Sequence, residues 1–503
     1  MLIQIIACIN FMNLSTAKAS KRAKEVGVRK VIGAEKSSLR IQFLVESFLL
    51  TLFSVLIAFP LLIIALPYLN QITNADIVLS AFSDYTIWLL VFGIIVITSI
   101  AAGSYPAFYL SAFKAIKVIK GNFTSHASAA GIRRSLVVFQ FTLSIVLIAS
   151  IIIIYNQLNY IKNKDLGFDK NQKLIFSFYT EAAKSKMHVF ANDLRELPDV
   201  KAVSLADNYM GQSSYHDWIV YLQGGNLAIG IDQQNLSSDE NFVKATGIKI
   251  ISGRDFRFHD SAKVLINETL MKRLGLNLQN APGTKLLTGD ERNYEVAGVM
   301  KDFNYSSLRN DINPFMIICE PNRGDLHDVI VNVSSEDYKM LLGKIKTIWQ
   351  KDLSTEPFQY AFLDAEVQRQ YQSEITFSNI INSFTLMAIL ISCLGLFGLA
   401  AFSAEQRKKE IGVRKVLGAS VAGVVQLLSK DFLKLVGISI LIATPVAWWA
   451  MNKWLQSFAY RIAISWWMFA LAGFIAILIS LLTISFQAIK AAVANPVESL
   501  RAQ

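Results

Sequence analysis

The residues with the clearest chemical pattern lie in two basic segments that are nearly identical. "KEVGVRKVIGA" occupies residues 24–34 and "KEIGVRKVLGA" occupies residues 409–419, so nine of eleven positions match at a distance of 385 residues. In each copy a glutamate precedes an arginine by four residues, which is the favourable order for an ion pair along one helix. These charged and apolar side chains suit binding of a protein partner at two equivalent sites.

Each segment is predicted to form a short helix in or just below the membrane plane, broken from the spanning helix before it. The first glycine of each copy should interrupt the helix, because glycine costs about 1 kcal/mol relative to alanine there. The second glycine should cap the C-terminus. One apolar face is expected from Val28, Val31 and Ile32, and in the copy from Val413, Val416 and Leu417. The ten candidate residues that carry this pattern are Glu25, Gly27, Arg29, Lys30 and Gly33, and in the copy Glu410, Gly412, Arg414, Lys415 and Gly418.

A simpler interpretation of one such segment is a topology signal that contacts lipid head groups. For a single copy that interpretation is favoured. Topology requires only charge, however, whereas both copies keep two glycines, a glutamate and an apolar face in the same register. The duplication therefore favours a docking surface. Glu46 and Asp431 are also matched acids, and we expect them to be solvated or paired.

Other residues offer little catalytic chemistry. The three cysteines, Cys8, Cys319 and Cys393, have neither the spacing of a disulfide framework nor that of a zinc site. The five histidines are scattered, and the phosphate-binding pattern GxxxxGK[ST] is absent from the sequence. We therefore predict no catalytic residue, no metal site and no cofactor, and we do not expect the chain to hydrolyse ATP by itself.

The composition indicates a membrane protein. Hydrophobic residues make up 53% of the chain and charged residues 17%, whereas a soluble protein carries about 25% charged residues. The formal net charge is +11. In a membrane protein such an excess lies in cytoplasmic loops beside lipid head groups, so we expect membrane lipids and not nucleic acid as partners.

About 20 apolar residues are needed to cross a bilayer as a helix. Seven spans are predicted, at 1–19, 41–67, 87–110, 135–157, 378–402, 421–449 and 465–486. Loops 15–40, 109–134 and 403–420 hold eight, five and five Lys/Arg residues, whereas loops 69–85 and 451–465 hold none and two. The positive-inside rule then places the first set and the C-terminus in the cytoplasm, and it places residues 158–375 outside.

The outer region 158–375 is predicted to be an α+β domain. Its amphipathic helices are expected near 182–196 and 335–351. Its candidate strands are 173–178, 217–222, 264–267, 294–300, 315–320, 328–333 and 358–363. The sequence "NYMGQSSYHDW" at 208–218 offers a contact loop, although Tyr215 and Trp218 are equally compatible with a core.

The duplication extends beyond the two basic segments. Cys8 aligns with Cys393, and the tails "FKAIKVIKG" (113–121) and "ANPVESLRA" (494–502) are related. The predicted organisation is a first repeat at 1–121, a linker and spanning helix at 122–157, the outer domain at 158–375 and a second repeat at 376–503. The first repeat begins at its second helix, so we expect a further spanning helix and outer domain to precede Met1 in a longer product.

Taken together, the motifs resemble the FtsX-like permeases, the family that includes MacB-type ABC transporters. The two "KExGVRKVxGA" segments are similar to that family's cytoplasmic coupling segment, and "NPVESLR" (495–501) also fits. Five further stretches resemble the MacB-like periplasmic core domain. They are "LGFDKNQKLIF" (166–176), "SGRDF" (252–256), "VLINETLMKRLG" (264–275), "VAGVMKDFNYSSLR" (296–309) and "FLDAEVQRQYQSE" (362–374).

The resemblance implies a polytopic α-helical protein of the bacterial inner membrane, with about seven spanning helices, two FtsX-like repeats and one α+β periplasmic domain. It also implies a cytoplasmic ABC ATPase as partner, bound by the ten candidate residues, and mechanical transmission to the periplasmic domain for export or release of a substrate. The alternative within the family is an FtsX-type regulator or signalling protein, and a periplasmic partner protein remains open.

Two other classes are less favoured by the sequence. A ligand-sensing receptor would need an inner output domain, but the longest inner segments are about 26 residues. A membrane enzyme or protease would need a nucleophile or metal-ligand set, and no such motif stands out.

Overall fold

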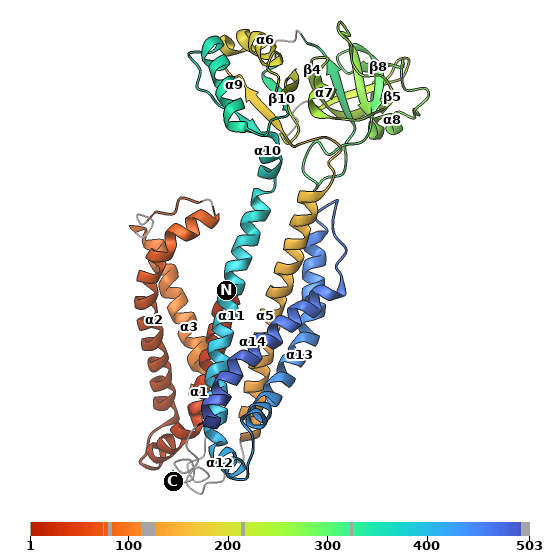
Figure 1. Ribbon diagram of the computed structural model, residues 1–503. Coiled ribbons are helices and arrows are strands. Elements are labelled where there is room, and N and C mark those ends of the chain that lie inside the picture. The colour runs from red at the N-terminus through yellow and green to blue at the C-terminus, as the bar shows by residue number, and fades with distance from the viewer. Residues whose placement is uncertain are drawn as a thin grey trace. The chain divides into compact units, whose positions relative to one another are not determined.

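The chain divides into two units that are described separately. The computed structural model describes residues 2–73, 75–78, 83–111, 126–212, 217–321 and 325–493, with no side-chain description at 16–25, 27, 105–106, 109–111, 126–130, 409 and 491–492. The helical unit comprises Met1–Gln157, Ile375–Leu455 and Ala463–Gln503. The α/β unit comprises Leu158–Glu374 and Gln456–Ile462. Figure 1 shows the elements of both, and the tails at 113–121 and 494–502 lie outside the described residues.

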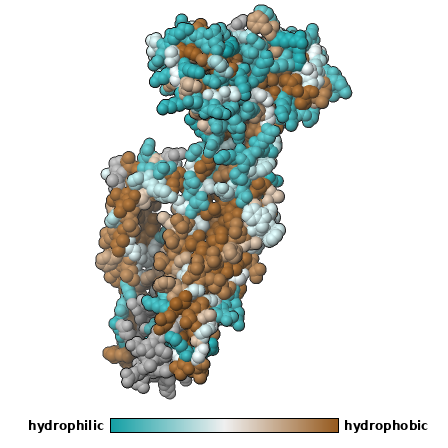
Figure 2. Space-filling model, viewed as in Figure 1, coloured by the Kyte–Doolittle hydropathy of each residue, from teal (hydrophilic) through white to brown (hydrophobic). Residues whose placement is uncertain are grey.

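The described part of the helical unit consists of helices, most of them long and apolar. They are α1 (Leu2–Val31), α2 (Lys36–Thr73), α3 (Tyr85–Ser111), α5 (His126–Asn163), α11 (Gln372–Gln406), α12 (Lys408–Val416), α13 (Val421–Leu455) and α14 (Trp466–Val493). Among the described residues, six helices are long and apolar enough to cross a membrane, namely α2, α3, α5, α11, α13 and α14. Figure 2 shows hydrophobic residues gathered over these helices and hydrophilic residues over the α/β unit.

Six of the seven predicted spans are therefore confirmed. The remaining one is α1, whose apolar stretch Leu2–Ser15 is shorter than a typical span. Its role as a seventh span stays a prediction.

The two repeats meet where equivalent helices touch. Gly395 of α11 is 385 residues from Asn10 of α1, and a Cβ at Gly395 would collide with the Asn10 side chain. Asn10 Nδ2 donates to the Ile391 carbonyl oxygen at 3.2 Å. Ile391 lies 385 residues from Ile6, and these two residues belong to the same hydrophobic cluster. Equivalent positions thus face each other, as expected for two copies related by a local two-fold axis.

In the α/β unit, one part is an open four-stranded sheet. Its strands follow the order β11 (Ala361–Phe362), β1 (Lys173–Ser177), β10 (Asp328–Val333) and β2 (Val200–Ala206), and all neighbours are antiparallel. Alternate residues of each strand face one side, as in Leu174 and Phe176 of β1, which pair with Val331 and Val329. They form a core with α6 (Glu181–Arg195) and α9 (Tyr338–Asp352).

The other part is a ring of six strands. The strands β3 (Asp217–Leu222), β4 (Ile231–Ser238), β6 (Lys263–Asn267), β7 (Lys285–Thr288), β8 (Asn293–Met300) and β9 (Phe315–Cys319) each pair with two others of the set. The short strand β5 (Ile250–Gly253) pairs with β8. The ring encloses its own apolar core, and it joins the open sheet through the pair Ala206–Ser238.

Short helices complete the α/β unit. They are η2 (Leu227–Ile229), α7 (Phe242–Thr246), α8 (Glu268–Arg273) and α10 (Leu363–Arg369). The helix starts follow the usual capping chemistry, since the Thr180 hydroxyl accepts from Ala183 N at 3.1 Å and Asp337 Oδ1 accepts from Met340 N at 3.0 Å. These caps fix α6 and α9 over the open sheet.

Most of the predicted strands are confirmed within a residue or two. The exception is 358–363, where only Ala361–Phe362 pairs as a strand. Strands β2, β4, β5 and β7 were not expected. Within the proposed contact loop 208–218, Tyr215 lies outside the described residues. Trp218 lies in β3 and packs against the apolar core of the ring, as the core interpretation expects.

Candidate functional site

The two basic segments, here called the coupling segments (residues 24–34 and 409–419), differ in how they follow the preceding helix. The first is continuous with α1, which runs unbroken from Leu2 to Val31. The second is separated, because α11 ends at Gln406 and α12 begins at Lys408. Between them Arg407 has a ψ of 13°, far from the helical value of about −42°. The predicted break is therefore confirmed in the second copy and wrong in the first.

The predicted interruption at Gly27 and Gly412 is also wrong. Both glycines lie inside helices, α1 and α12. A glycine inside a helix costs only about 1 kcal/mol, and packing of the same helix can offset that. The break in the second copy occurs at Arg407, five residues earlier than expected.

The predicted caps at Gly33 and Gly418 are confirmed, with the same geometry in both copies. Gly33 and Gly418 adopt positive φ angles of 102° and 88°. Gly33 N donates to Lys30 O at 3.2 Å and Gly418 N donates to Lys415 O at 3.1 Å. The following alanines donate to Arg29 O and Arg414 O at 3.0 and 2.9 Å. This double bond pattern is the Schellman motif, which favours glycine at the left-handed position.

Each coupling segment is fixed to the helical unit by an equivalent apolar residue. Val26 packs with Leu39, Phe43 and Ala107, and Ile411 packs with Val424, Leu428 and Ala488. The first three members of each cluster stand 385 residues apart. Sequence reasoning missed this anchor, although its signal was present: position 26/411 is one of the two substituted positions, and it stays aliphatic in both copies.

The opposite side of each segment presents exposed apolar side chains. Val28, Val31 and Ile32 are 54%, 61% and 81% exposed, and Val413, Val416 and Leu417 are 49%, 67% and 80% exposed. The predicted apolar face therefore exists in both copies, and the exposures agree position by position. Burial of such side chains by a partner would be favourable, at about 25 cal/mol per Å².

The charges beside this face are similar but not identical. Arg414 Nη2 lies 2.8 Å from Glu410 Oε1, so the predicted pair within the helix is confirmed in the second copy. In the first copy the Glu25 side chain lies outside the described residues, and Arg29 Nη1 donates to Gln42 Oε1 at 2.8 Å. Burial, together with the charges of Lys36 and Arg40, lowers the pKa of Lys30. The Lys30 ammonium group thus lies near two further positive charges, those of Lys36 and Arg40.

One further ion pair braces the break in the second copy. Arg407 Nη2 lies 2.9 Å from Asp431 Oδ2, which joins the α11–α12 corner to α13. The expectation that Asp431 is solvated or paired is confirmed, since it pairs with Arg407. Because Asp431 is 56% exposed, the pair contributes mainly to the position of the corner and little to stability.

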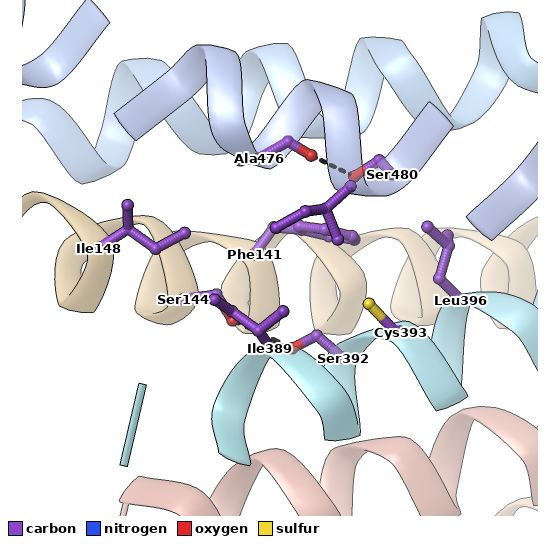
Figure 3. Close-up of a pocket in the computed structure, with 10 residues that line it drawn as sticks. Phe141, Ser144, Ile148, Ile389, Ser392, Cys393, Leu396, Ala476 and Ser480 are labelled. Carbon is purple, nitrogen blue, oxygen red and sulfur yellow. Dashed lines mark hydrogen bonds between the residues drawn. The ribbon is translucent and has the colours of Figure 1, made fainter. Parts of the chain in front are cut away.

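The helical unit also contains a small cavity, shown in Figure 3, between α5, α11 and α14. Its volume of about 20 Å³ suits one water molecule. The hydroxyls on its wall already have partners, because Ser144 and Ser392 lie 3.0 Å apart and Ser480 donates to Ala476 O at 2.7 Å. This cavity is too small to bind a substrate.

Two family models match this chain. The family model described as FtsX-like permease C-terminal matches residues 1–115 and again residues 382–496. Each match contains one coupling segment. The family model described as MacB-like periplasmic core domain matches residues 139–335.

Two curated relatives are described as macrolide export ATP-binding/permease protein MacB. The protein from Bdellovibrio bacteriovorus is 29% identical over 116 residues, which is 23% of this chain and 17% of the relative. The protein from Neisseria gonorrhoeae is 22% identical over 198 residues, which is 37% of this chain and 30% of the relative. The chain thus matches less than a third of the length of either relative.

Two solved structures resemble part of this chain. The periplasmic region of MacB from Actinobacillus actinomycetemcomitans covers 41% of this chain and 96% of its own, with 14% identity and a TM-score of 0.30. A domain of a putative permease from Porphyromonas gingivalis covers 38% of this chain and 90% of its own, with 16% identity and a TM-score of 0.29. From the two repeat matches, the core-domain match and the six apolar helices, the chain belongs to the FtsX-like permeases of ABC transporters that carry a MacB-like periplasmic core domain.

Proposed function

We propose that this chain is the membrane subunit of an ABC transporter and that a separate ATPase subunit binds its two coupling segments. In this proposal the ATPase supplies the free energy of ATP hydrolysis. The chain transmits the resulting motion to its α/β unit, which lies in the periplasm, for export or release of a substrate. The segments and the C-terminus lie in the cytoplasm of a bacterial cell, and the helices span the inner membrane.

The observation that carries the proposal is the match between the two exposed faces. A dimeric motor offers two equivalent surfaces, and a chain that meets both needs two equivalent contacts. Here the anchors, the caps and the exposed triads recur in the same register. A topology signal would need none of these features, because it depends on charge alone.

The local structure suggests how motion enters the helical unit. The first segment is one body with α1, so a displacement of residues 24–34 acts directly on that helix. The second segment is a separate helix, α12, whose displacement reaches α11 through Arg407 and reaches α13 through the Arg407–Asp431 pair. Since α1 and α11 contact each other at Asn10 and Gly395, movement of the two segments converges there.

The residues assigned to docking are the ten named above, now divided by role. Arg29, Lys30, Arg414 and Lys415 would meet acidic groups of the ATPase. Gly33 and Gly418 end the helices and set their length. Gly27 and Gly412 add no side chain to the helix surface beside the exposed triads. Glu410 orients Arg414, and Glu25 is assigned the same role for Arg29.

Reconstitution tests the proposal directly. We expect the full chain in lipid nanodiscs to bind a stand-alone ABC ATPase encoded beside it and to change that enzyme's rate of ATP hydrolysis. Each chain should bind two ATPase subunits. A chain that purifies in a stable, functional complex without any nucleotide-hydrolysing subunit would contradict the proposal.

A further inference from the structure

The segment Gln456–Ile462 joins α13 to α14, yet it belongs to the α/β unit and not to the helices that it connects. Its backbone pairs with a loop that follows β8. Ala459 N donates to Arg309 O at 3.0 Å, and Tyr460 N donates to Leu308 O at 3.3 Å. Leu308 and Phe458 are almost fully buried, so the segment packs closely against the α/β unit at Leu308 and Arg309. This place is here called the seat of the segment.

Arg309 holds this seat with its side chain as well as its backbone. The guanidinium carbon lies 5.1 Å from the centre of the Phe458 ring, within the range of a cation–π contact. Arg309 Nη2 also lies 2.5 Å from Glu374 Oε1. Glu374 is only 3% exposed and stands at the start of α11. One side chain thus contacts both the α13–α14 segment and the base of α11.

Neighbouring residues bring the end of α5 and the start of α11 to the same place. Lys164, which follows α5, lies 4.2 Å from the centre of the Tyr460 ring. The Tyr371 hydroxyl accepts from Leu308 N at 2.8 Å, and Tyr371 directly precedes α11. The chain leaves the α/β unit through α5 and α11, and both exits are packed against the seat of the α13–α14 segment.

We propose that Arg309 is a latch that fastens the α13–α14 segment to the α/β unit, so that α13 and α14 pull on this unit as well as α5 and α11. The chain itself connects the α/β unit to the helical unit through α5 and through α11. The contacts of Arg309 add a third, noncovalent connection, which holds the α13–α14 segment on the α/β unit. Arg309 acts here as a positioning residue, and only the source of the pulling force rests on the proposed function.

The latch can be tested in the full chain in nanodiscs by hydrogen exchange and mass spectrometry. In the parent protein the amides of Ala459 and Tyr460 are bonded to Leu308 and Arg309, so they should exchange slowly. We expect Arg309→Ala to accelerate exchange in residues 456–462 by about tenfold or more, because opening of that segment becomes local and frequent. Exchange in β10 should not change. Equal protection in the variant and the parent would overturn the latch, and so would faster exchange throughout the α/β unit.

Arg292→Ala is the matched control. Arg292 also lies over an aromatic ring, 5.8 Å from Trp218, and pairs with Asp290 at 2.9 Å. It belongs to the same unit, and within the part of the chain that the structure describes it contacts Trp218, Asp290 and Tyr294. Its loss should leave exchange at 456–462 unchanged, and a tenfold increase there would overturn the assignment to Arg309.

A reversible bond gives a second test. Ala459 N donates to Arg309 O at 3.0 Å, so these two positions are neighbours at which a disulfide can be tested. In a background with Cys8, Cys319 and Cys393 replaced by alanine, Arg309→Cys with Ala459→Cys should restore slow exchange when oxidised and lose it when reduced. Arg309→Cys alone should stay fast in both conditions, whereas Ala459→Cys alone keeps Arg309 and should exchange as slowly as the parent in both.

The same variants separate the latch from the proposed function. If an ATPase binds, ATP should change exchange in the α/β unit of the parent and of the oxidised double-cysteine variant, and this response should fall at least severalfold in Arg309→Ala. An unchanged response in Arg309→Ala would overturn the mechanical role. If no ATPase binds, the proposed function fails, whereas the exchange of residues 456–462 still decides whether the latch exists.

Discussion

Reversal of charge at both Arg29 and Arg414 is expected to abolish binding of the ATPase. Each arginine lies beside an exposed apolar triad, so an acidic partner group would be desolvated when the triad is covered. Loss of one member of such a pair costs about 2–5 kcal/mol, and reversal adds repulsion. The Arg29→Glu/Arg414→Glu chain should therefore bind at least about 100-fold more weakly than the parent, measured with labelled ATPase and nanodiscs at fixed ionic strength.

A charge swap separates partner recognition from helix stability. Glu410→Arg with Arg414→Glu keeps the net charge and a pair within α12, although in the less favourable order, which costs only tenths of a kcal/mol. With Arg29→Glu added, this chain should also fail to bind. Single reversals should leave one site intact and give intermediate binding. Full binding by the double reversal would mean that these arginines do not meet the ATPase.

Asp328→Asn is expected to stabilise the α/β unit at neutral pH. Asp328 is 1% exposed, accepts a hydrogen bond from the Ser177 hydroxyl and has Oδ2 3.6 Å from His327 Nε2. Burial and the nearby charge of Asp207 raise the pKa of Asp328 to about 6, against the lowering effects of Ser177 and His327. The ionised carboxylate is therefore disfavoured in the folded protein.

The sign of the pH dependence follows from linkage. The unfolded pKa of aspartate is about 3.9, so the folded state holds the proton more tightly between about pH 4 and pH 6. The stabilising contribution of Asp328 is complete below pH 4 and is lost as the pH rises through 6. The loss amounts to about 2–3 kcal/mol at neutral pH, and Asp328→Asn should avoid it while still accepting from Ser177.

Hydrogen exchange of the β1 and β10 amides between pH 4 and pH 8 measures this difference, after correction for the intrinsic exchange rate. The free energy of opening should fall across the window in the parent and stay flat in Asp328→Asn. Asp337→Asn is a control, because its exposed carboxylate caps α9 through Met340 N and asparagine caps a helix equally well. A parent whose opening free energy rises from pH 4 to pH 6 would contradict the assignment.

The sequence was sufficient to predict elements whose side chains alternate or repeat strongly. The apolar spans follow from length and composition, and strands such as β1 and β10 follow from alternating aliphatic residues. Strand β4 shows where this reasoning fails. Its residues Gln233, Asn235 and Ser237 are polar and yet buried, because the strand lies between β2, β3 and β9. Only the long-range pairing reveals it as a central strand.

The candidate site shows a similar division. The caps at Gly33 and Gly418 were predictable, because a helix end with positive φ favours glycine. The position of the break was not predictable. The packing of Ile411 against α13 and α14 can offset the free-energy cost of Gly412 inside the helix. Likewise, periodicity alone does not show which apolar side of a short segment is buried and which is exposed. Val26 is buried and Ile32 exposed because of the hairpin with α2 and the neighbouring α3.

Site-specific cross-linking tests the central claim most directly. Ile32 and Leu417 are the most exposed members of the two triads, at 81% and 80%, and they hold equivalent positions. A photo-reactive amino acid at either one, in cells that express the full chain and its ATPase, should attach to the same surface of the ATPase from the cytoplasmic side. Attachment only to lipid, or labelling of either position by a reagent confined to the outside of the inner membrane, would contradict the account.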